Sequence, residues 1–233
     1  MEPRSLCVIP ARGGSKRLER KNVKPLAGKP MIAYTIEAAL DSGVFDTVIV
    51  STEDEEIATV SEEYGATVPF ERPAELASDT AQVVDVVDHA LEYYDERGEE
   101  FTELGALLPT SPLRSATDLR GAADRFRDHE EAEFLMCVTE YQFSPFEALV
   151  ERDGWLEEYW DEDSFYGTRS QERPDLVVDN GAAYLMDVEA YRRERIFYGE
   201  KLIPHYMPPE RSVDVDERFD FEFAEFLLER RTE

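Results

Sequence analysis

Cysteine and long apolar runs are scarce in this sequence, and each scarcity excludes a class of protein. Among the 233 residues there are two cysteines, Cys7 and Cys137, and three widely separated histidines. So few cysteines exclude a disulfide scaffold, and such widely separated histidines give little support to a zinc site or a Cys–His nucleophile. No apolar stretch approaches the ~20 residues of a membrane helix, and the run at residues 6–9 is shorter than the roughly 7–15 apolar residues of a signal peptide. We therefore expect a cytoplasmic protein with no membrane partner.

Positive charge is also scarce. There are 53 aspartates and glutamates against 25 lysines and arginines, which gives a formal net charge of −28. Such a surface repels phosphate backbones, so we expect no nucleic-acid partner. High acid content with few lysines resembles proteins of salt-accumulating halophiles, in which molar salt shortens the Debye length to ~3 Å and screens self-repulsion. An ordinary acidic protein adapted to low salt is the alternative.

The few basic residues are unevenly placed. Four of the five lysines lie between Lys16 and Lys29, and Arg12, Arg17 and Arg20 share this stretch with only one acidic residue. A solvated charge run is the usual interpretation of such a cluster. Because the rest of the chain avoids lysine, the cluster here predicts a local anionic ligand.

Strand and helix signals alternate over the first 140 residues. Short apolar runs predict strands, and apolar residues at every third or fourth position predict helices. With hydrophobic residues at 42% of the chain, the pattern predicts an α/β fold in one domain over residues 1–233. The expected strands are 6–9, 47–50, 106–108, 134–138 and 182–186. The expected helices begin at Pro30 and Glu53, are capped by Asp79 or Thr80 and by Thr117, and end the chain at about 219–231.

The pattern changes after residue 140. Asp153 and Gly154 form a turn signal between two short apolar runs, which predicts a β-hairpin. The polar and aromatic stretch that follows has no regular period. We interpret residues 140–180 as an arm inserted in the domain. The arm carries more aromatic surface than a loop should expose, in Phe143, Phe146, Trp155 and Trp160.

The most informative segment joins the first predicted strand to the first predicted helix. It reads Ile9-Pro10-Ala11-Arg12-Gly13-Gly14-Ser15-Lys16-Arg17 and continues as Arg20-Lys21-Asn22. Parallel sheets bind ligands past the carboxyl ends of their strands, glycines let backbone N–H groups approach an anion, and arginine and lysine hold phosphate. The spacing fits neither a Walker loop nor a G-x-G-x-x-G fingerprint. The segment predicts polyphosphate binding, with a basic surface loop as the alternative.

The sequence of this segment closely resembles the signature of the acylneuraminate cytidylyltransferases, the CMP-sialic acid synthetase family. The match runs from Val8 to Lys24 and is followed by further family motifs in the expected order. These are Asn22-Val23-Lys24-Pro25-Leu26, Gly28-Lys29-Pro30-Met31-Ile32, Val50-Ser51-Thr52, the stretch from Arg72 to Thr80, Pro109-Thr110-Ser111-Pro112-Leu113-Arg114 and Asn180-Gly181-Ala182-Ala183-Tyr184. The resemblance covers nearly the whole chain. It implies a mostly parallel, Rossmann-like nucleotidyltransferase sheet flanked by helices, with the arm used for homodimerisation.

The resemblance also implies how CTP is held. Arg12, Lys16 and Lys21 would bind the triphosphate and, with Asp216, act in catalysis. The implied nucleotide-binding residues are Arg12, Gly13, Gly14, Ser15, Lys16, Lys21, Asn22, Arg72, Ser78, Asp79 and Thr80. From the residues alone, a surface ion pair for Arg72 and a helix cap formed by Ser78-Asp79-Thr80 remain alternatives.

Two aspartates near the end of the chain are candidates for metal binding. In Val213-Asp214-Val215-Asp216, alternate residues of an extended segment face one side, so Asp214 and Asp216 can converge on one ion. Carboxylates suit Mg²⁺, which also takes phosphate oxygens. In so acidic a chain a D-x-D pattern also arises by chance, but the family carries metal-binding aspartates at a matching position. We therefore expect a magnesium cofactor, and we interpret Asp220 as a helix cap.

The resemblance implies a sugar site built from Arg169, Gln171, Asn180 and Tyr184, with a guanidinium that pairs with the sugar's carboxylate. Arg173 is a further candidate, or a surface residue. The implied reaction is in-line attack of the anomeric hydroxyl of a nonulosonic, sialic-acid-like sugar on the α-phosphorus of CTP, with release of pyrophosphate. A cytidylyltransferase for another sugar such as Kdo, or a non-catalytic nucleotide-binding module, is the alternative.

Two positions depart from the sialic-acid pattern. Leu108 stands where the family commonly has glutamine before Pro-Thr-Ser-Pro, and Glu147 stands where it commonly has lysine. Both positions normally face the sugar. An apolar residue and an acid suit a sugar with fewer hydroxyls and more acylamino groups, such as legionaminic or pseudaminic acid. If both side chains point away, N-acetylneuraminic acid is the ordinary substrate.

Overall fold

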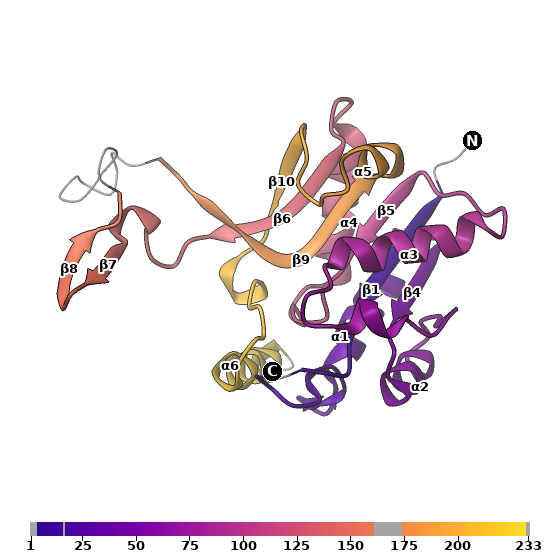
Figure 1. The fold of residues 1–233 in the computed structure, drawn as a ribbon, viewed down its shortest axis with the longest axis horizontal. Coiled ribbons are helices and arrows are strands. Elements are labelled where there is room, and N and C mark those ends of the chain that lie inside the picture. The colour runs from indigo at the N-terminus through magenta and orange to yellow at the C-terminus, as the bar shows by residue number, and fades with distance from the viewer. Residues whose placement is uncertain (1–3, 16, 161–173, 232–233) are drawn as a thin grey trace.

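The computed structural model describes residues 4–15, 17–160 and 174–231. Its centre is a six-stranded sheet with the order β10-β6-β9-β5-β1-β4 (Figure 1). The strands are β1 (Ser5–Pro10), β4 (Thr47–Ser51), β5 (Glu103–Ala106), β6 (Phe134–Glu140), β9 (Val177–Asp187) and β10 (Leu202–Tyr206). Only β9 runs antiparallel to its neighbours, β5 and β6, whereas the other adjacent pairs are parallel. The predicted α/β fold with a mostly parallel sheet is confirmed.

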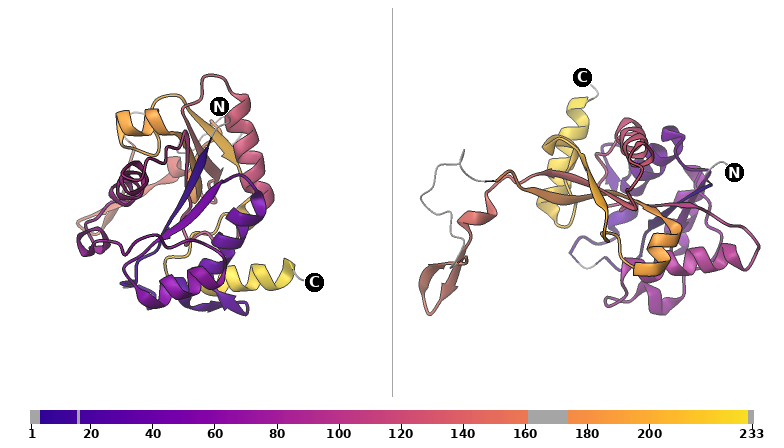
Figure 2. Two further views of the ribbon diagram at one scale, coloured as in Figure 1. Left: turned by 90° about the vertical axis from the view of Figure 1, so that its right-hand side faces the viewer. Right: turned by 90° about the horizontal axis from the view of Figure 1, so that it is seen from above.

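Helices cover both faces of this sheet (Figure 2). They are α1 (Met31–Ser42), α2 (Glu55–Glu63), α3 (Val83–Asp95), α4 (Ala116–Asp128), α5 (Val188–Glu194) and α6 (Arg218–Arg231). The first, second and fourth share a core cluster on one face, and α3 and α5 share another on the opposite face. None of the helices in the described part of the chain has the length and apolar character needed to cross a membrane.

Strand β1 shows why a continuous apolar run lies at the centre of the sheet. Cys7 and Ile9 belong to the cluster on one face, whereas Leu6 and Val8 belong to the cluster on the other. All four side chains are fully buried, because successive residues of a strand point to opposite sides and both sides are covered by helices.

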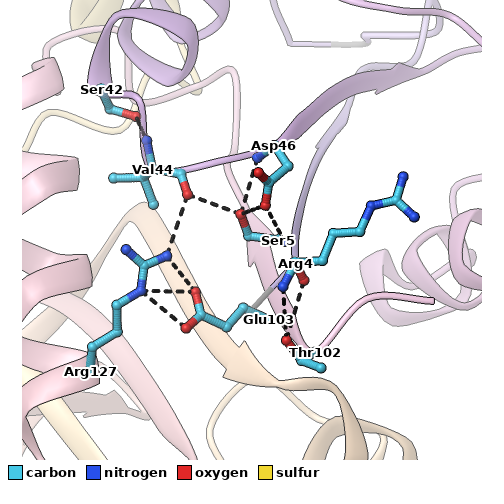
Figure 3. Close-up of polar contacts among 8 residues, drawn as sticks. All are labelled: Arg4, Ser5, Ser42, Val44, Asp46, Thr102, Glu103 and Arg127. Carbon is cyan, nitrogen blue, oxygen red and sulfur yellow. Dashed lines mark hydrogen bonds and ion pairs between the residues drawn. The ribbon is translucent and has the colours of Figure 1, made fainter. Parts of the chain in front are cut away.

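The starting end of β1 is held by a polar network (Figure 3). Ser5 donates its backbone N–H to Asp46 at 2.8 Å and its hydroxyl to Asp46 at 2.9 Å and to the carbonyl of Val44 at 3.0 Å. Arg127 of α4 reaches the same corner and pairs with Glu103 at 2.5 Å. These contacts fix the sheet at the end opposite to the carboxyl ends of its strands.

The helix starts differ from those expected. Helix α2 was expected to begin at Glu53. Its cap is instead Asp54, one residue later, which accepts from the N–H of Ile57 at 3.0 Å. Helix α3 is capped at Gln82, whose N–H donates to Asp85 at 3.2 Å, so neither Asp79 nor Thr80 is its cap. The cap expected at Thr117 lies two residues earlier, at Ser115, which shares a capping box with Asp118. In each case, a hydrogen bond with a residue in the first helical turn determines which of several adjacent polar residues caps the helix.

Three elements were missed from the sequence. They are α5, the edge strand β10, and the short ladder of β2 (Pro25–Leu26) with β3 (Lys29–Pro30). A 3₁₀ turn from Lys21 to Val23 precedes that ladder. The 3₁₀ turn and the β2–β3 ladder together close the loop that follows β1 and lead it into α1.

The predicted hairpin is confirmed at the tip of the arm. Strands β7 (Leu149–Arg152) and β8 (Trp155–Glu158) pair across Asp153 and Gly154, both with positive φ. The outer parts of β6 and β9 lead away from the body toward this hairpin (Figures 1 and 2). Their register shifts between Met136 and Val138, a bulge that reorients the outgoing ribbon.

Candidate active site

A cleft of about 510 Å³ opens at the carboxyl ends of β1, β4 and β5. It is the position at which open parallel sheets place their ligands. The cleft gathers predicted nucleotide-binding and catalytic residues from three separate parts of the sequence. Those that line it are Arg12, Ser15, Lys21, Asn22, Arg72, Ser78, Asp79 and Asp216, together with Arg17, Leu108 and Thr110.

The loop after β1 is folded tightly against the segment after β4. A Cβ atom on Gly13 would overlap the carboxylate of Asp54 and displace it, whereas Gly14 faces open space. The N–H of Gly13 donates to Glu53 at 2.7 Å rather than into the cleft. Asn22 donates its side-chain amide to the carbonyl of Arg12 at 3.0 Å and thereby holds the loop closed. The glycines therefore shape the loop, and Lys16 lies outside the described residues.

The cations of the cleft are paired with carboxylates. Arg12 donates to Asp79 and to the carbonyl of Ser78, both at 3.2 Å. Lys21 donates to the carbonyl of Val215 at 2.6 Å and to Asp216 at 3.2 Å. The second carboxylate oxygen of Asp216 accepts from Arg17 at 2.9 Å. An incoming polyphosphate would compete with Asp79 and Asp216 for these cations.

Arg72 is buried, with 4% of its surface exposed, which excludes the alternative of a surface ion pair. Its guanidinium donates to the hydroxyl of Ser51 at 3.1 Å and to the carbonyl of the same residue, and lies 4.0 Å from Glu53. Burial lowers the pKa of Arg72 to about 10, an effect that Glu53 opposes and Arg12 reinforces. The guanidinium stays protonated at neutral pH and presents a rigid positive charge at the wall of the cleft.

The segment Ser78-Asp79-Thr80 does not cap α3; Ser78 instead ends the 3₁₀ helix Ala74–Ala77. Ser78 and Asp79 line the cleft, and the hydroxyl of Thr80 lies 3.3 Å from that of Ser78. The segment precedes α3 by several residues, which leaves Ser78 and Asp79 facing the phosphate loop.

Two of the three C-terminal aspartates fit a metal site. Val215 is fully buried and its N–H donates to the carbonyl of Thr110 at 2.7 Å, so Asp214 and Asp216 lie on either side of a fixed point. Asp214 is exposed, yet desolvation by the surrounding protein raises its pKa. Repulsion from Asp216 raises this pKa further, and a hydrogen bond from Thr110 opposes the shift. Two hard oxygen ligands beside a polyphosphate cleft suit Mg²⁺.

Asp220 has the capping role expected for it. Its carboxylate accepts from the N–H groups of Asp216 at 3.1 Å and Glu217 at 2.8 Å, at the start of α6. That prediction is confirmed. No cluster of three or more metal-ligating side chains occurs among residues 4–15, 17–160 and 174–231.

Two of the expected sugar ligands point into the protein. Asn180 is 3% exposed, and its side chain donates to Ser212 at 2.9 Å and accepts from the N–H of Ala182 at 3.0 Å. Tyr184 is buried and donates its hydroxyl to Asp179 at 2.6 Å. Neither lines the cleft, so the structure assigns both to the base of the arm. Arg169, Gln171 and Arg173 lie outside the described residues.

Sequence reasoning missed several residues of the site. Glu53 holds both Gly13 and Arg72, and its position directly after the β4 motif was the available signal. Thr110 anchors the D-x-D segment through its backbone and side chain. Arg114 is buried behind the cleft, where it donates to the carbonyl of Leu108, and burial lowers its pKa to about 10. Its place at the end of the Pro109–Arg114 motif was the available signal.

The sequence is similar to those of known cytidylyltransferases. The sequence profile described as cytidylyltransferase matches residues 6–203. The chain is 35% identical over 228 residues to a pseudaminic acid cytidylyltransferase of Campylobacter jejuni, covering 96% of each chain. It is 33% identical over 234 residues to an N-acylneuraminate cytidylyltransferase of Escherichia coli, covering 99% of this chain and 54% of the relative.

A solved structure shares the fold. It is that of a CMP:2-keto-3-deoxy-manno-octonic acid synthetase complexed with CTP, with a TM-score of 0.70, 17% identity and coverage of 98% of this chain and 99% of that one. At this identity the likeness concerns the fold alone. From the profile match and the relatives at 33–35% identity, the chain belongs to the cytidylyltransferase family.

Proposed function

We propose that this protein transfers CMP from CTP to the anomeric hydroxyl of a nonulosonic acid and releases pyrophosphate. The observation that carries the proposal is the convergence of Arg12, Lys21 and Arg72 with the Asp214–Asp216 pair at the carboxyl ends of β1, β4 and β5. Relatives that share a third of their residues with this chain act on sugars of this class. In a chain with a net charge of −28, such a concentration of cations needs an anionic ligand.

The side chains of the cleft divide into mobile and fixed cations. Arg12 and Lys21 would exchange Asp79 and Asp216 for the triphosphate, together with Lys16 from the same loop. Arg72 is held by Ser51 and would keep its position while the nucleotide binds. Cations held against a developing negative charge in a closed cleft stabilise the transition state more than they would in water.

Asp214 and Asp216 would hold magnesium next to the phosphates. When bound, this ion would neutralise charge on the transferring and leaving groups. The chain's own contribution is the alignment: Val215 fixes both carboxylates through the carbonyl of Thr110. Asp216 would then be a metal ligand rather than the partner of Lys21 and Arg17, and both cations would be available for phosphate.

For the sugar, we propose a diacylamino nonulosonic acid of the pseudaminic or legionaminic type over N-acetylneuraminic acid. Leu108 lines the cleft and can neither donate nor accept a hydrogen bond with its side chain. Glu147, at the base of the hairpin, is exposed and carries the opposite charge to the lysine common in the family. Both changes favour a sugar with fewer hydroxyls. Asn180 and Tyr184 would act as positioning residues beneath it.

We also propose that two copies pair through the arm. Phe143 is 81% exposed, Trp155 75% and Leu156 70%. Contact of this apolar surface with water is unfavourable, and burial against a second copy would remove it. Arg169 and Gln171 lie within this arm and would then reach the sugar site of either copy. A fully active monomer by light scattering at working salt would refute the homodimer.

The function is tested by pyrophosphate release with CTP and a panel of sugars. We expect release with nonulosonic acids and none with Kdo or sugar phosphates. A protein that binds CTP but releases no pyrophosphate with any sugar would instead be a nucleotide-binding module. Competition of pseudaminic and N-acetylneuraminic acid for limiting enzyme tests the finer proposal, which a clear kcat/KM preference for N-acetylneuraminic acid would defeat.

A further inference from the structure

Helix α6 carries a stripe of three exposed phenylalanines that the proposed reaction does not use. Phe219 is 76% exposed, Phe223 42% and Phe226 47%. Spacings of four and three residues place them on one face of the helix. The rings of Phe219 and Phe223 stack with centroids 6.4 Å apart, and Arg230 lies 4.6 Å over the ring of Phe226. We call these three side chains the α6 stripe.

The stripe lies opposite the face that fixes α6 to the body. On that inner face, Phe221 and Ala224 are buried in a cluster with Leu18, Leu26 and Leu113, next to the phosphate loop. The helix is therefore anchored without the α6 stripe, and it projects from the body in Figure 2. Single exposed apolar residues are common, but three aligned aromatic rings on one helix mark an interaction surface.

We propose that the α6 stripe binds the α6 stripe of a second copy of this chain, as an antiparallel helix pair. Phe223 is at the middle of the stripe, with Phe219 four residues before it and Phe226 three residues after it. A twofold axis near Phe223 therefore brings Phe219 of each copy against Phe226 of the other. Such a self-complementary patch is what a twofold interface requires.

The charges of the helix select the antiparallel direction. Residues 216–222, at its start, carry four acidic residues and Arg218, whereas residues 224–231, at its end, carry two acidic residues and two arginines. An antiparallel pair places the negative start of each helix beside the neutral end of the other, whereas a parallel pair would place the two negative starts together. The opposed helix dipoles add to this preference.

The contact is small and depends on salt. A helix of 14 residues is ~21 Å long, and one such pair falls short of the roughly 800 Å² per partner of a standard interface. Two copies with a net charge of −28 each also repel one another until salt screens them. The pairing is therefore expected at molar salt and micromolar concentrations. With the proposed arm contact it would give a dimer of dimers.

The pairing is tested by measuring the masses of wild type and of Phe223→Glu by sedimentation velocity, in 2 M KCl and over a range of protein concentrations. We expect the wild-type assembly to fall to half its mass in the variant, whether or not the arm also pairs, with CTP turnover unchanged. Tyr198→Glu is the matched control, because Tyr198 is 63% exposed and lies outside α6. Equal masses for wild type and Phe223→Glu at every concentration would overturn the proposal.

A crosslink keeps the test valid if the glutamate variant fails to fold. Cys7 and Cys137 are buried, so a cysteine introduced on the surface is the reactive one. Oxidised Phe223→Cys is expected to give a disulfide-linked dimer in high yield, since Phe223 lies near the twofold axis. Tyr198→Cys is expected to remain uncrosslinked. No crosslink in Phe223→Cys, or equal yields in both variants, would contradict the antiparallel pair.

Discussion

Replacing Lys21 by methionine removes one positive charge from the cleft and keeps most of the length of the side chain. The side chain of Lys21 is 12% exposed, and its ammonium touches the carbonyl of Val215 at 2.6 Å and Asp216 at 3.2 Å. A charged contact to the transferring phosphate in such a partly desolvated place is worth about 2–4 kcal/mol. We therefore expect Lys21→Met to lower kcat/KM by roughly 30- to 1000-fold. The free energy of unfolding should fall by roughly 1–3 kcal/mol, because a mostly buried ammonium loses its hydrogen bonds to Val215 and Asp216.

The assay is initial-rate pyrophosphate release at subsaturating CTP, with the fold checked by circular dichroism. Lys29→Met is the matched control, since Lys29 pairs with Glu37 and lies over Tyr34, outside the cleft. Lys21→Arg should recover part of the activity by restoring the charge. A folded Lys21→Met enzyme with kcat/KM within threefold of wild type would refute the assignment of Lys21 to the phosphates.

Three further predictions concern the metal, the acid stability and the salt response. EDTA should stop turnover and Mg²⁺ restore it, and Asp216→Asn should lower kcat more than Asp220→Asn; the reverse order would show that the metal site is misplaced. Asp118→Ala should destabilise the fold by about 3 kcal/mol at neutral pH, because it leaves Arg211 without its partner at 2.9 Å. Burial raises the pKa of Asp118 but hydrogen bonds from Arg211 and Ser115 outweigh it, so the pKa in the folded state is lowered. The stabilisation by Asp118 is therefore complete above the unfolded-state pKa of about 4, and it is lost as the pH falls through the lower pKa of the folded state. If the difference in urea midpoint between wild type and Asp118→Ala does not shrink in acid, this prediction is wrong. Finally, the melting temperature should rise toward molar KCl, because salt screens repulsion among 53 acidic residues, and a maximum in dilute buffer would contradict the halophilic interpretation.

The strands and the phosphate loop could be predicted because local signals there agree with the tertiary structure. The run from Leu6 to Ile9 is apolar at every position, as a central strand covered on both faces must be. Strand β10 gave no such signal. It is an edge strand in which Leu202 and Tyr206 are exposed, and it contains Pro204, which edge strands tolerate.

Helix starts were displaced for a local reason. Asp79, Thr80 and Gln82 are all polar residues before an apolar helix, and only the contact of Gln82 with Asp85 selects one of them. In α1, Leu40 follows the apolar helical period yet is 42% exposed, because the period alone does not determine how wide the buried face of the helix is.

The direction of side chains in the site depends on long-range geometry. Asn180 and Tyr184 belong to a recognisable motif, yet Gly181 adopts a positive φ, and the β6–β9 register shift turns both side chains inward. Arg72 could equally have formed a surface ion pair, and its burial follows from the way residue 72 bridges back to Thr52 at the end of β4. Such placements depend on chain segments that are distant in sequence.

The central claim is that the anomeric oxygen of a nonulosonic acid attacks the α-phosphorus of CTP. The most direct test is ³¹P NMR and mass spectrometry of the products formed with CTP and a sugar labelled with ¹⁸O at its anomeric hydroxyl. The account predicts one CMP–sugar conjugate per pyrophosphate, with the label in the bridge between sugar and phosphorus and none in pyrophosphate. Pyrophosphate that forms together with free CMP, or a label found in pyrophosphate, would contradict it.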